Sequence, residues 1–393
     1  MDPITHGIAG SLLGKGFFER REGRFATYAA ILGAVFPDVD VFVEIFARDP
    51  LSVIRYHRGF THSFVGLPIF ALALAALTRW AFRRRGAPSF WVLALIYAIG
   101  IASHILLDAL TSFGTRIWNP FSTDRVAWDF LFIIDFCLTA ILLVPQVAAW
   151  VFGDRDKAPR RSWIAWIAFM IAAFASWGLC VFTGFGFHTW ILAVIAAVFA
   201  AIFILPRVGG VGFAISKPAW SIAGTVVALA YIAAVGVAHA TALKRVEAFA
   251  TENHLDVVRL AALPSPPSLL EWSGKIRVTD GVYQSHIDLR DSSAPAFQFV
   301  ADSPHDSYVN DAMNLPDAGL YLWFARFPVI RAHVDGENHV VQFGDSRFAE
   351  PGRRMPQPFR LTFVLNPEGQ LVEEDWSEGA AGLRMRKIHK QGN

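Results

Sequence analysis

The sequence has little cysteine, little charge and no block of basic residues, and each shortage excludes a class of protein. Its two cysteines, Cys137 and Cys180, both lie in apolar stretches, so neither a disulfide framework nor a cysteine-based metal site is available. Charged residues make up 17% of the 393 residues, below the roughly 25% of soluble domains. Without a basic cluster, nucleic-acid binding is not expected. The mean hydropathy of +0.40 is typical of an integral membrane protein.

Long hydrophobic runs predict the membrane segments. They lie near residues 64–82, 90–110, 130–152, 163–183, 188–206 and 219–240, and about 18–23 residues suffice to cross a hydrocarbon core. Two shorter runs, 3–16 and 25–37, are interpreted as a helical hairpin packed inside the bundle. No cleavable signal peptide is expected, because His6 interrupts the first apolar run. We therefore predict an all-α polytopic bundle of about six spans after a short hairpin.

Lysine and arginine residues concentrate on alternate loops between these runs. The richer set comprises Lys15, Arg20, Arg21, Arg24, Arg79, Arg83, Arg84, Arg85, Arg155, Lys157, Arg160, Arg161, Arg207 and Lys217, and the poorer set comprises Arg48, Arg55, Arg58, Arg116 and Arg125. The positive-inside rule places the richer set in the cytoplasm. The other loops, and the chain beyond about residue 241, are then predicted on the extracytoplasmic side of a bacterial cytoplasmic membrane.

Histidine and aspartate residues recur in short motifs within the first third of the chain. They are His6, Asp38 and Asp40 in Phe36-Pro37-Asp38-Val39-Asp40, His57 and His62 in His57-Arg58-Gly59-Phe60-Thr61-His62-Ser63, and His104 and Asp108 in Ser103-His104-Ile105-Leu106-Leu107-Asp108. Ionisable residues at membrane segments mark functional sites, and imidazole with carboxylate is a ligand set for zinc or manganese. All of them fall on the predicted outer side. The motifs therefore predict a site for one or two divalent metal ions.

The spacing within each motif indicates how its members could act. His104 and Asp108 are four residues apart and share one helix face, so both could bind a metal, or Asp108 could orient His104. The alternative is a buried hydrogen-bonded pair. Asp38 and Asp40 follow a helix exit, where a cation would relieve their repulsion by the helix dipole. One or both could be ligands. His6 lies in the first turn of its helix, with Asp2 as the expected N-cap.

Further residues are candidates for catalysis or substrate binding. Thr61 is the expected N-cap of the 64–82 helix, which would place His62 in the first helical turn. His62 is a candidate ligand or general acid, and Asp135, inside the 130–152 run, is a candidate ligand or general base. Water-facing or interfacial positions are the alternatives for both. Arg58, Arg116 and Arg125 could contact an anionic substrate group such as a phosphate, or anchor lipid headgroups.

Beyond residue 243 the composition changes to that of a small β-rich domain. Short strand-like runs occupy 275–278, 282–288, 297–301, 320–324, 339–343 and 359–364, with turn dipeptides Asp280-Gly281, Asp335-Gly336 and Glu368-Gly369. Pro264, Pro266 and Pro267 are interpreted as a linker. We expect a metal-site membrane module over 1–136, further transmembrane helices over 137–243 and a β-rich extracytoplasmic domain over 244–393.

The order and spacing of these motifs over about residues 1–136 resemble a known family. Met1-Asp2-Pro3-Ile4-Thr5-His6, the Pro37–Asp40, His57–Ser63 and Ser103–Asp108 blocks, Thr111-Ser112-Phe113-Gly114-Thr115, Asn119-Pro120-Phe121-Ser122 and an intramembrane acid like Asp135 are similar to the YdjM/YfhP-type family of bacterial inner-membrane, predicted metal-dependent hydrolases. The resemblance implies a membrane hydrolase that uses His6, Asp38, Asp40, His57, His62, His104 and Asp108. Membrane lipids are the expected partners, and a lipid or lipid-linked phosphoester is the expected substrate. The alternative is a non-enzymatic metal-binding scaffold or sensor with an envelope-facing β domain.

Overall fold

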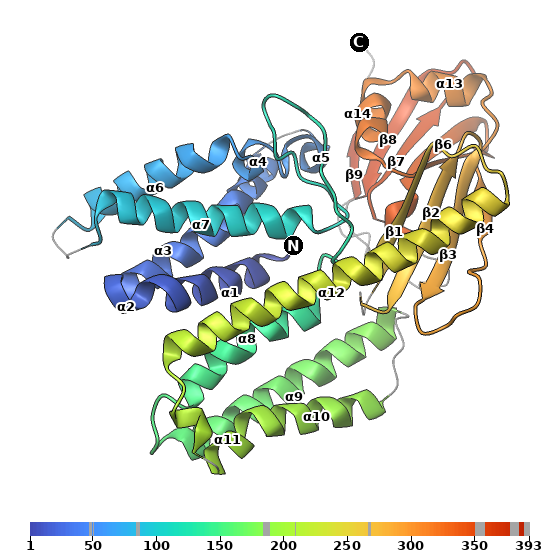
Figure 1. The fold of residues 1–393 in the computed structure, drawn as a ribbon. Helices are drawn as coiled ribbons and strands as arrows, with labels where there is room; N and C mark the ends of the chain where they lie inside the picture. The colour runs from blue at the N-terminus through green and yellow to red at the C-terminus, as the bar shows by residue number, and fades with distance from the viewer. Residues whose placement is uncertain are drawn as a thin grey trace. The chain divides into compact units, whose positions relative to one another are not determined.

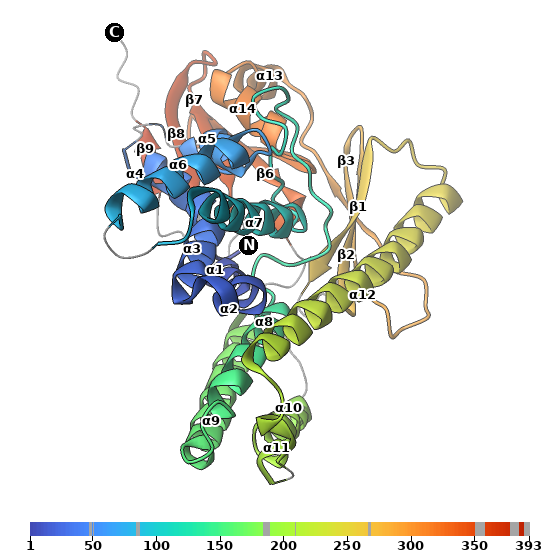
Figure 2. The ribbon, with the colours of Figure 1, turned by 60° about the vertical axis from the view of Figure 1, so that its left-hand side comes forward.

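The computed structural model describes residues 1–46, 49, 51–83, 87–183, 189–208, 210–265, 269–349, 358–377 and 385–388. The chain forms two compact units (Figures 1 and 2). The first consists of Met1–Asp40 and Arg58–Val235, and the second of Val41–His57 and Gly236–Asn393. The second unit therefore includes a short segment from the first third of the sequence as well as the C-terminal region.

The first unit is helical. Its elements are α1 (Pro3–Leu13), the π-helical turn η1 (Gly14–Phe18), α2 (Glu19–Glu22), α3 (Arg24–Val35), the 3-10 turns η2 (Phe36–Asp40) and η3 (Phe60–His62), α6 (Gly66–Ala81), α7 (Phe90–Ala109), α8 (Phe136–Val151), α9 (Ala158–Thr183), α10 (Trp190–Phe203), α11 (Leu205–Val208), η4 (Val211–Phe213) and the first part of α12 (Lys217–Glu252). Asp2 caps α1 by accepting a hydrogen bond from the Thr5 amide, as its sequence predicts.

Five helical segments within the described residues are long and apolar enough to cross a membrane. They are Arg24–Val43, Phe90–Ala109, Ala158–Phe182, Trp190–Val208 and Lys217–Glu252. The predicted run at 64–82 yields a helix of 16 residues, and so does the run at 130–152. By contrast, the segment predicted as half of a hairpin continues past Pro37, because a proline early in a new 3-10 turn needs no N–H partner. The chain is a multi-pass membrane protein.

Glycines bring α1, α3 and α7 into close contact. A Cβ atom at Gly10 of α1 would lie 2.6 Å from the Ala30 carbonyl oxygen of α3, and one at Gly100 of α7 would lie 2.8 Å from the same oxygen. Small residues allow such backbone approach between membrane helices. Buried Ala26, Leu93 and Ile101 fill the apolar core beside these contacts. Consequently, these contacts fix the relative positions of three parts of the unit: the N-terminal end of α1, the C-terminal end of α3 and the C-terminal half of α7.

The second unit contains two antiparallel sheets. One has the order β1 (Arg259–Ser265), β2 (Glu271–Val278), β3 (Gly281–Asp288), β4 (Gln298–Ala301), and the other has the order β5 (Pro328–Asp335), β6 (Asn338–Asp345), β7 (Arg360–Leu365), β8 (Leu371–Ser377), β9 (Met385–Ile388). Helices α13 (Ser307–Met313) and α14 (Pro316–Phe324) lie between them in sequence, and α4 (Val41–Phe46), α5 (Ser52–Tyr56) and the end of α12 also belong to this unit. The predicted fold class is confirmed.

Two predictions for this unit are wrong in detail. Residues 320–324 belong to α14 and not to a strand, because Pro316 starts a helix and a short apolar run does not distinguish the two structures. Pro264 lies within β1 and not in a linker, since β1 is an edge strand in which a missing N–H needs no partner. Pro266 and Pro267 lie outside the described residues. The turn at Asp280-Gly281 joins β2 to β3 as predicted.

Candidate metal centre

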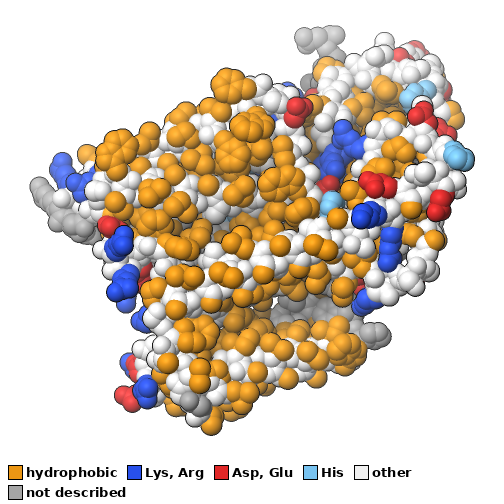
Figure 3. Space-filling model, viewed as in Figure 1, with side chains coloured by type: hydrophobic (Ala, Val, Ile, Leu, Met, Phe, Trp, Pro, Cys, Tyr) orange, Lys and Arg blue, Asp and Glu red, His pale blue; other side chains and the backbone are white. Residues whose placement is uncertain are grey.

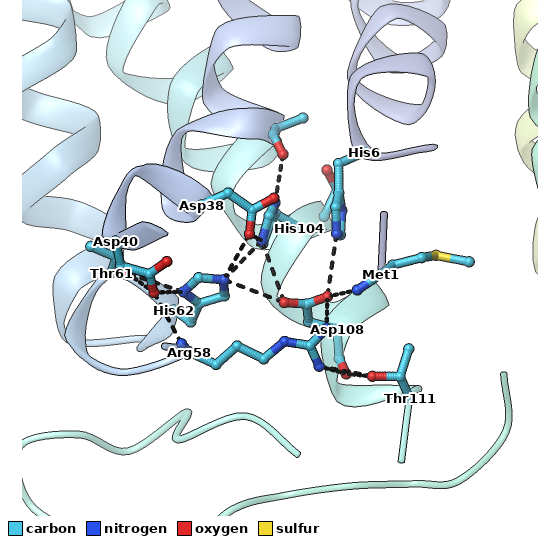
Figure 4. Close-up of polar contacts among 12 residues, drawn as sticks. Met1, His6, Asp38, Asp40, Arg58, Thr61, His62, His104, Asp108 and Thr111 are labelled. Carbon is cyan, nitrogen blue, oxygen red and sulfur yellow. Dashed lines mark hydrogen bonds and ion pairs between the residues drawn. The ribbon is translucent and has the colours of Figure 1, made fainter. Parts of the chain in front are cut away.

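Three separate segments of the first unit deliver histidine and aspartate side chains to one place (Figure 4). The turn η2 after α3 provides Asp38, the turn η3 provides His62, and the C-terminal half of α7 provides His104 and Asp108. The side chains of His62, His104 and Asp108 are at most 1% exposed, whereas that of Asp38 is 16% exposed. The group is therefore buried, with its one partly accessible side at Asp38.

The distances within this four-residue group match those of a metal centre. The two imidazole Nε2 atoms of His62 and His104 lie 3.0 Å apart. Asp38 Oδ1 lies 3.5 Å and 3.4 Å from them, and Asp108 Oδ2 lies 3.3 Å and 3.4 Å from them. Ligands bonded at about 2.0–2.1 Å around a tetrahedral metal are separated by about 3.3 Å. Four donor atoms thus surround a space of the size that a divalent metal fills.

The hydrogen bonds around the two imidazoles fix their tautomers. His104 Nδ1 lies 2.7 Å from the backbone oxygen of Ala34, and because a carbonyl oxygen only accepts, this nitrogen carries the proton. His62 Nδ1 lies 3.2 Å from Asp40 Oδ2, and in a neutral ring that donates from Nδ1 to this carboxylate the Nε2 atom carries no proton. In these tautomers both Nε2 lone pairs point toward the two carboxylate oxygens, as metal binding requires.

The four donor atoms face one another at close range. When both imidazoles are neutral with Nε2 unprotonated, these nitrogens and the two carboxylate oxygens repel one another at the distances given above. Moreover, Asp38 Oδ2 is buried and has no hydrogen-bond partner among the residues that the structure describes. A divalent cation would satisfy all of these atoms, so the residues present fit a metal such as zinc or manganese.

The second carboxylate oxygen of Asp108 is held by cationic and polar groups. Arg58 Nη2 lies 2.9 Å from Oδ1, His6 Nε2 lies 3.3 Å from it, and the amino group of Met1 also contacts it. Arg58 further donates to Thr111 Oγ1 at 2.8 Å. These contacts orient Asp108 so that its Oδ2 faces the two imidazoles. Within the described residues of the first unit, Asp38, His62, His104 and Asp108 form one four-donor group.

Asp40 connects the loop containing Arg58 to the metal ligands. Its Oδ2 accepts hydrogen bonds from the Arg58 amide at 3.0 Å and from Thr61 Oγ1 at 3.1 Å, in addition to the contact with His62. Arg58 has a φ of 56°, which is uncommon for a residue other than glycine. A backbone conformation of this kind is kept where surrounding contacts hold it in place. The contacts of Asp40 therefore hold the loop that contains Arg58 beside the metal ligands.

The structure places the remaining predicted residues as follows. His6 stacks on His104 with ring centroids 3.7 Å apart, beside the four-donor group and not in it. His57 is the C-cap of α5 and belongs to the second unit, so its ligand role stays a prediction. Asp135 caps α8 and accepts a hydrogen bond from Tyr231 Oη at 3.0 Å, outside the metal-ligand groups of the described residues. Arg116 and Arg125 lie in the loop after α7. The Arg116 amide donates to Arg58 O, in the loop before η3, at 3.1 Å, and Arg125 Nη1 donates to Gly114 O at 3.1 Å.

Two expectations about the segment that precedes α6 are corrected. Thr61 is not the N-cap of α6, because the helix begins at Gly66 and the Ser63 hydroxyl accepts from the Gly66 amide at 2.9 Å. His62 accordingly lies in η3 and not in a first helical turn. Sequence reasoning also missed the Ala34 carbonyl and the contact of Arg58 with Asp108. No local signal marks either, since both depend on which helices pack together.

The first unit defines a multi-pass membrane protein with a buried candidate centre of two histidines and two aspartates. A family model described as YdjM inner membrane protein matches residues 1–186. The chain is 30% identical over 141 residues to the inner membrane protein YbcI of Escherichia coli (strain K12), covering 35% of this chain and 78% of YbcI. The chain therefore belongs to the YdjM inner membrane protein family, as its motifs predict, and is a multi-pass inner membrane protein.

A second relative is the uncharacterized protein YfhP of Bacillus subtilis (strain 168). It is 25% identical over 125 residues, which cover 32% of this chain and 36% of YfhP. The match thus spans about a third of the length of that relative. No solved structure matches the chain.

Proposed function

We propose that this protein is a metal-dependent hydrolase of the bacterial inner membrane. The observation that carries the proposal is the convergence of two imidazole Nε2 atoms and two carboxylate oxygens, with Asp40 and the Ala34 carbonyl in contact with the opposite nitrogen of each ring. A divalent metal bound there would activate water and polarise a scissile ester or phosphoester bond. Zinc and manganese are the ions that suit this mixture of nitrogen and oxygen donors.

The chain's own residues can supply the other requirements of hydrolysis. Asp38 has the most exposed side chain of the four, so its carboxylate is the one placed to accept a proton from water. Arg58 balances part of the negative charge through Asp108. In this proposal His62 acts as a ligand, while Asp135 acts outside the centre by capping α8.

A lipid or lipid-linked phosphoester is the proposed substrate. The centre lies at the ends of helices that are long and apolar enough to span a membrane, where a lipid headgroup can approach. Arg116 and Arg125 are cations in the loop that follows α7, and guanidinium groups bind phosphate oxygens well. The unequal distribution of basic loops supports an extracytoplasmic position for both the centre and the β-rich domain.

A metal-binding scaffold is the second candidate function. The distances between the four protein donors allow all of them to bind one ion. Four protein ligands complete a tetrahedral zinc site and leave no position for water, which favours a structural metal. In that case the metal would only stabilise the ends of α3 and α7. The two functions differ in whether bound metal supports turnover.

Metal content and hydrolysis, measured on the same variants, test both candidates. The full chain is purified without chelator, resupplied with zinc or manganese, and compared with His104→Ala and with Asp135→Asn as a control outside the centre. We expect stoichiometric metal in the unmodified protein and the control, and loss in His104→Ala. Hydrolysis of phosphoester lipids by the loaded protein, abolished by Asp38→Asn, supports the enzyme. Bound metal without turnover of any ester or phosphoester supports the scaffold.

A further inference from the structure

A second site lies in the first unit, far along the helices from the metal centre. It is a cavity of about 1020 Å³ formed by the end of α1 with η1 and α2, the start of α3, the end of α8, the start of α9 and the start of α12. Arg24 begins α3, whereas Asp38 follows its end. At 1.5 Å per residue these positions are about 20 Å apart. The cavity is therefore separate from the centre described above.

The cavity carries an excess of positive charge. Its lining includes the cations Lys15, Arg20, Arg24, Arg161 and Lys217, against the acids Glu19 and Asp154. Asp154 pairs with Lys157, which is not part of the lining. Arg20, Arg24 and Lys217 form no ion pair with any residue that the structure describes. Figure 3 shows Lys and Arg side chains gathered at the left-hand end of the helices, where α2 and α11 lie.

A helix N-terminus without a side-chain cap and a buried hydroxyl add to this charge. Both α3 and α12 begin at the cavity, and no side chain caps the N-terminus of α3. Free N–H groups at helix N-termini favour anions. The hydroxyl of Ser221, a lining residue that is 1% exposed, has no hydrogen-bond partner among the described residues. A buried hydroxyl without a partner is unfavourable unless a ligand or water completes it.

The same cavity also has an apolar side. Ile31, Ala149, Trp150 and Pro218 belong to its lining together with Tyr28. Tyr28 is 65% exposed and Trp150 is 43% exposed, and such aromatic residues are enriched at the membrane–water interface. The volume lies just above the roughly 300–1,000 Å³ typical of ligand cavities. The mixture of cations and apolar side chains fits a ligand that has both a phosphate and a hydrocarbon part.

We propose that this cavity binds the phosphate headgroup of an anionic phospholipid. In this arrangement Arg20, Arg24 and Lys217 contact the headgroup oxygens, and Ser221 donates a hydrogen bond. The apolar lining contacts the glycerol and the first acyl carbons. The bound lipid would join α1, α3, α8 and α12 at the end opposite the metal centre. The proposal does not depend on the function of that centre.

Native mass spectrometry of the full chain with added phosphatidylglycerol or phosphatidylcholine tests this proposal. We expect the unmodified protein to retain phosphatidylglycerol at least about tenfold more strongly, since hydrogen bonds to a charged group have about that effect. The double variant Arg24→Gln with Lys217→Gln should lose this preference. The matched control is Arg83→Gln with Arg160→Gln, which removes two exposed cations outside the cavity. It should change the preference by less than about twofold.

Additional measurements distinguish a lipid phosphate from a soluble phosphate and test whether the variants are folded. Ser221→Ala, which alters no charge, should weaken phosphatidylglycerol retention several-fold, and an unchanged helical circular dichroism spectrum would show that each variant is folded. Equal losses in the cavity variant and the control would overturn the proposal, because the effect would then be diffuse surface charge. Displacement of the lipid by millimolar inorganic phosphate would overturn the assignment to a lipid in favour of a soluble anion. An absence of preference in the unmodified protein would refute the site altogether.

Discussion

Asp40 is the residue whose substitution tests the four-donor centre most sharply, because it contacts His62 through Nδ1 and is not one of the four donors. Its Oδ2 accepts from His62 Nδ1, the Arg58 amide and Thr61 Oγ1 at 3.2, 3.0 and 3.1 Å. Asp40→Asn keeps an acceptor oxygen but removes the charge, and charge-assisted hydrogen bonds are about twice as strong as neutral ones. Asp40→Ala removes every contact. The two substitutions should therefore weaken metal binding to different extents.

The magnitude follows from the role of such a partner. Loss of a group that orients a ligating histidine typically reduces metal affinity by about 10–100-fold. We expect Asp40→Asn to reduce metal affinity about tenfold, a loss of about 1.4 kcal/mol of binding free energy. Asp40→Ala should reduce it about 100-fold, a loss of about 2.8 kcal/mol. The order of affinities should be wild type, Asn variant, Ala variant.

Competition with a chromogenic chelator measures these affinities in detergent. Asp135→Asn serves as the control, because Asp135 caps α8 and does not contact the four donors. Helical circular dichroism of the metal-free proteins should be the same for all variants. Affinities that remain equal in Asp40→Ala and wild type would refute the assignment of the His62 tautomer, and equal losses in the control would show a general effect on folding.

Three further predictions concern packing, the β-rich unit and the metal itself. Gly100→Leu should destabilise the helical unit by about 1–3 kcal/mol and lower metal affinity, as measured by thermal unfolding and chelator competition, whereas Gly178→Leu, with open space around its Cβ, should change neither. Asp345→Ala removes the partner of buried Arg347, whose Nε lies 2.6 Å from Asp345 Oδ2. This substitution should destabilise the second unit by about 3–5 kcal/mol, as measured by proteolysis of the full chain. A variant as resistant to protease as the wild type would contradict this prediction. Chelation should lower the unfolding temperature, because ligand at 100 times its Kd contributes about 2.7 kcal/mol, and an unchanged temperature would argue against a bound metal.

Local spacing predicted the parts of the centre that lie within one helix. The separation of His104 and Asp108 by four residues places them on one face of α7, and both belong to the four-donor group. The grouping of Asp38 and His62 with them was predicted from shared residue chemistry and predicted membrane side. The hydrogen bond from His104 to the Ala34 carbonyl was not predictable, because it requires the register of α3 against α7.

Turns and short apolar runs limited the rest of the prediction. Thr61 and Ser63 are both reasonable N-caps by residue type, and only the folded loop decides that Thr61 faces Asp40. Residues 320–324 carry no period that separates strand from helix. The β-rich character of the C-terminal region was predictable because turns such as Asp280-Gly281 have a strong local signature.

The glycine contacts among α1, α3 and α7 have a consequence for how the protein can diverge. Because Gly10 and Gly100 bring backbone against backbone, the spacing of these helices does not depend on the size of neighbouring side chains. Lipid-facing positions can therefore exchange one apolar residue for another while His104 keeps its place relative to Asp38. Sequence drift in the helices and constancy of the donor geometry are compatible in this architecture, and substitutions at the glycines themselves should be the rare ones.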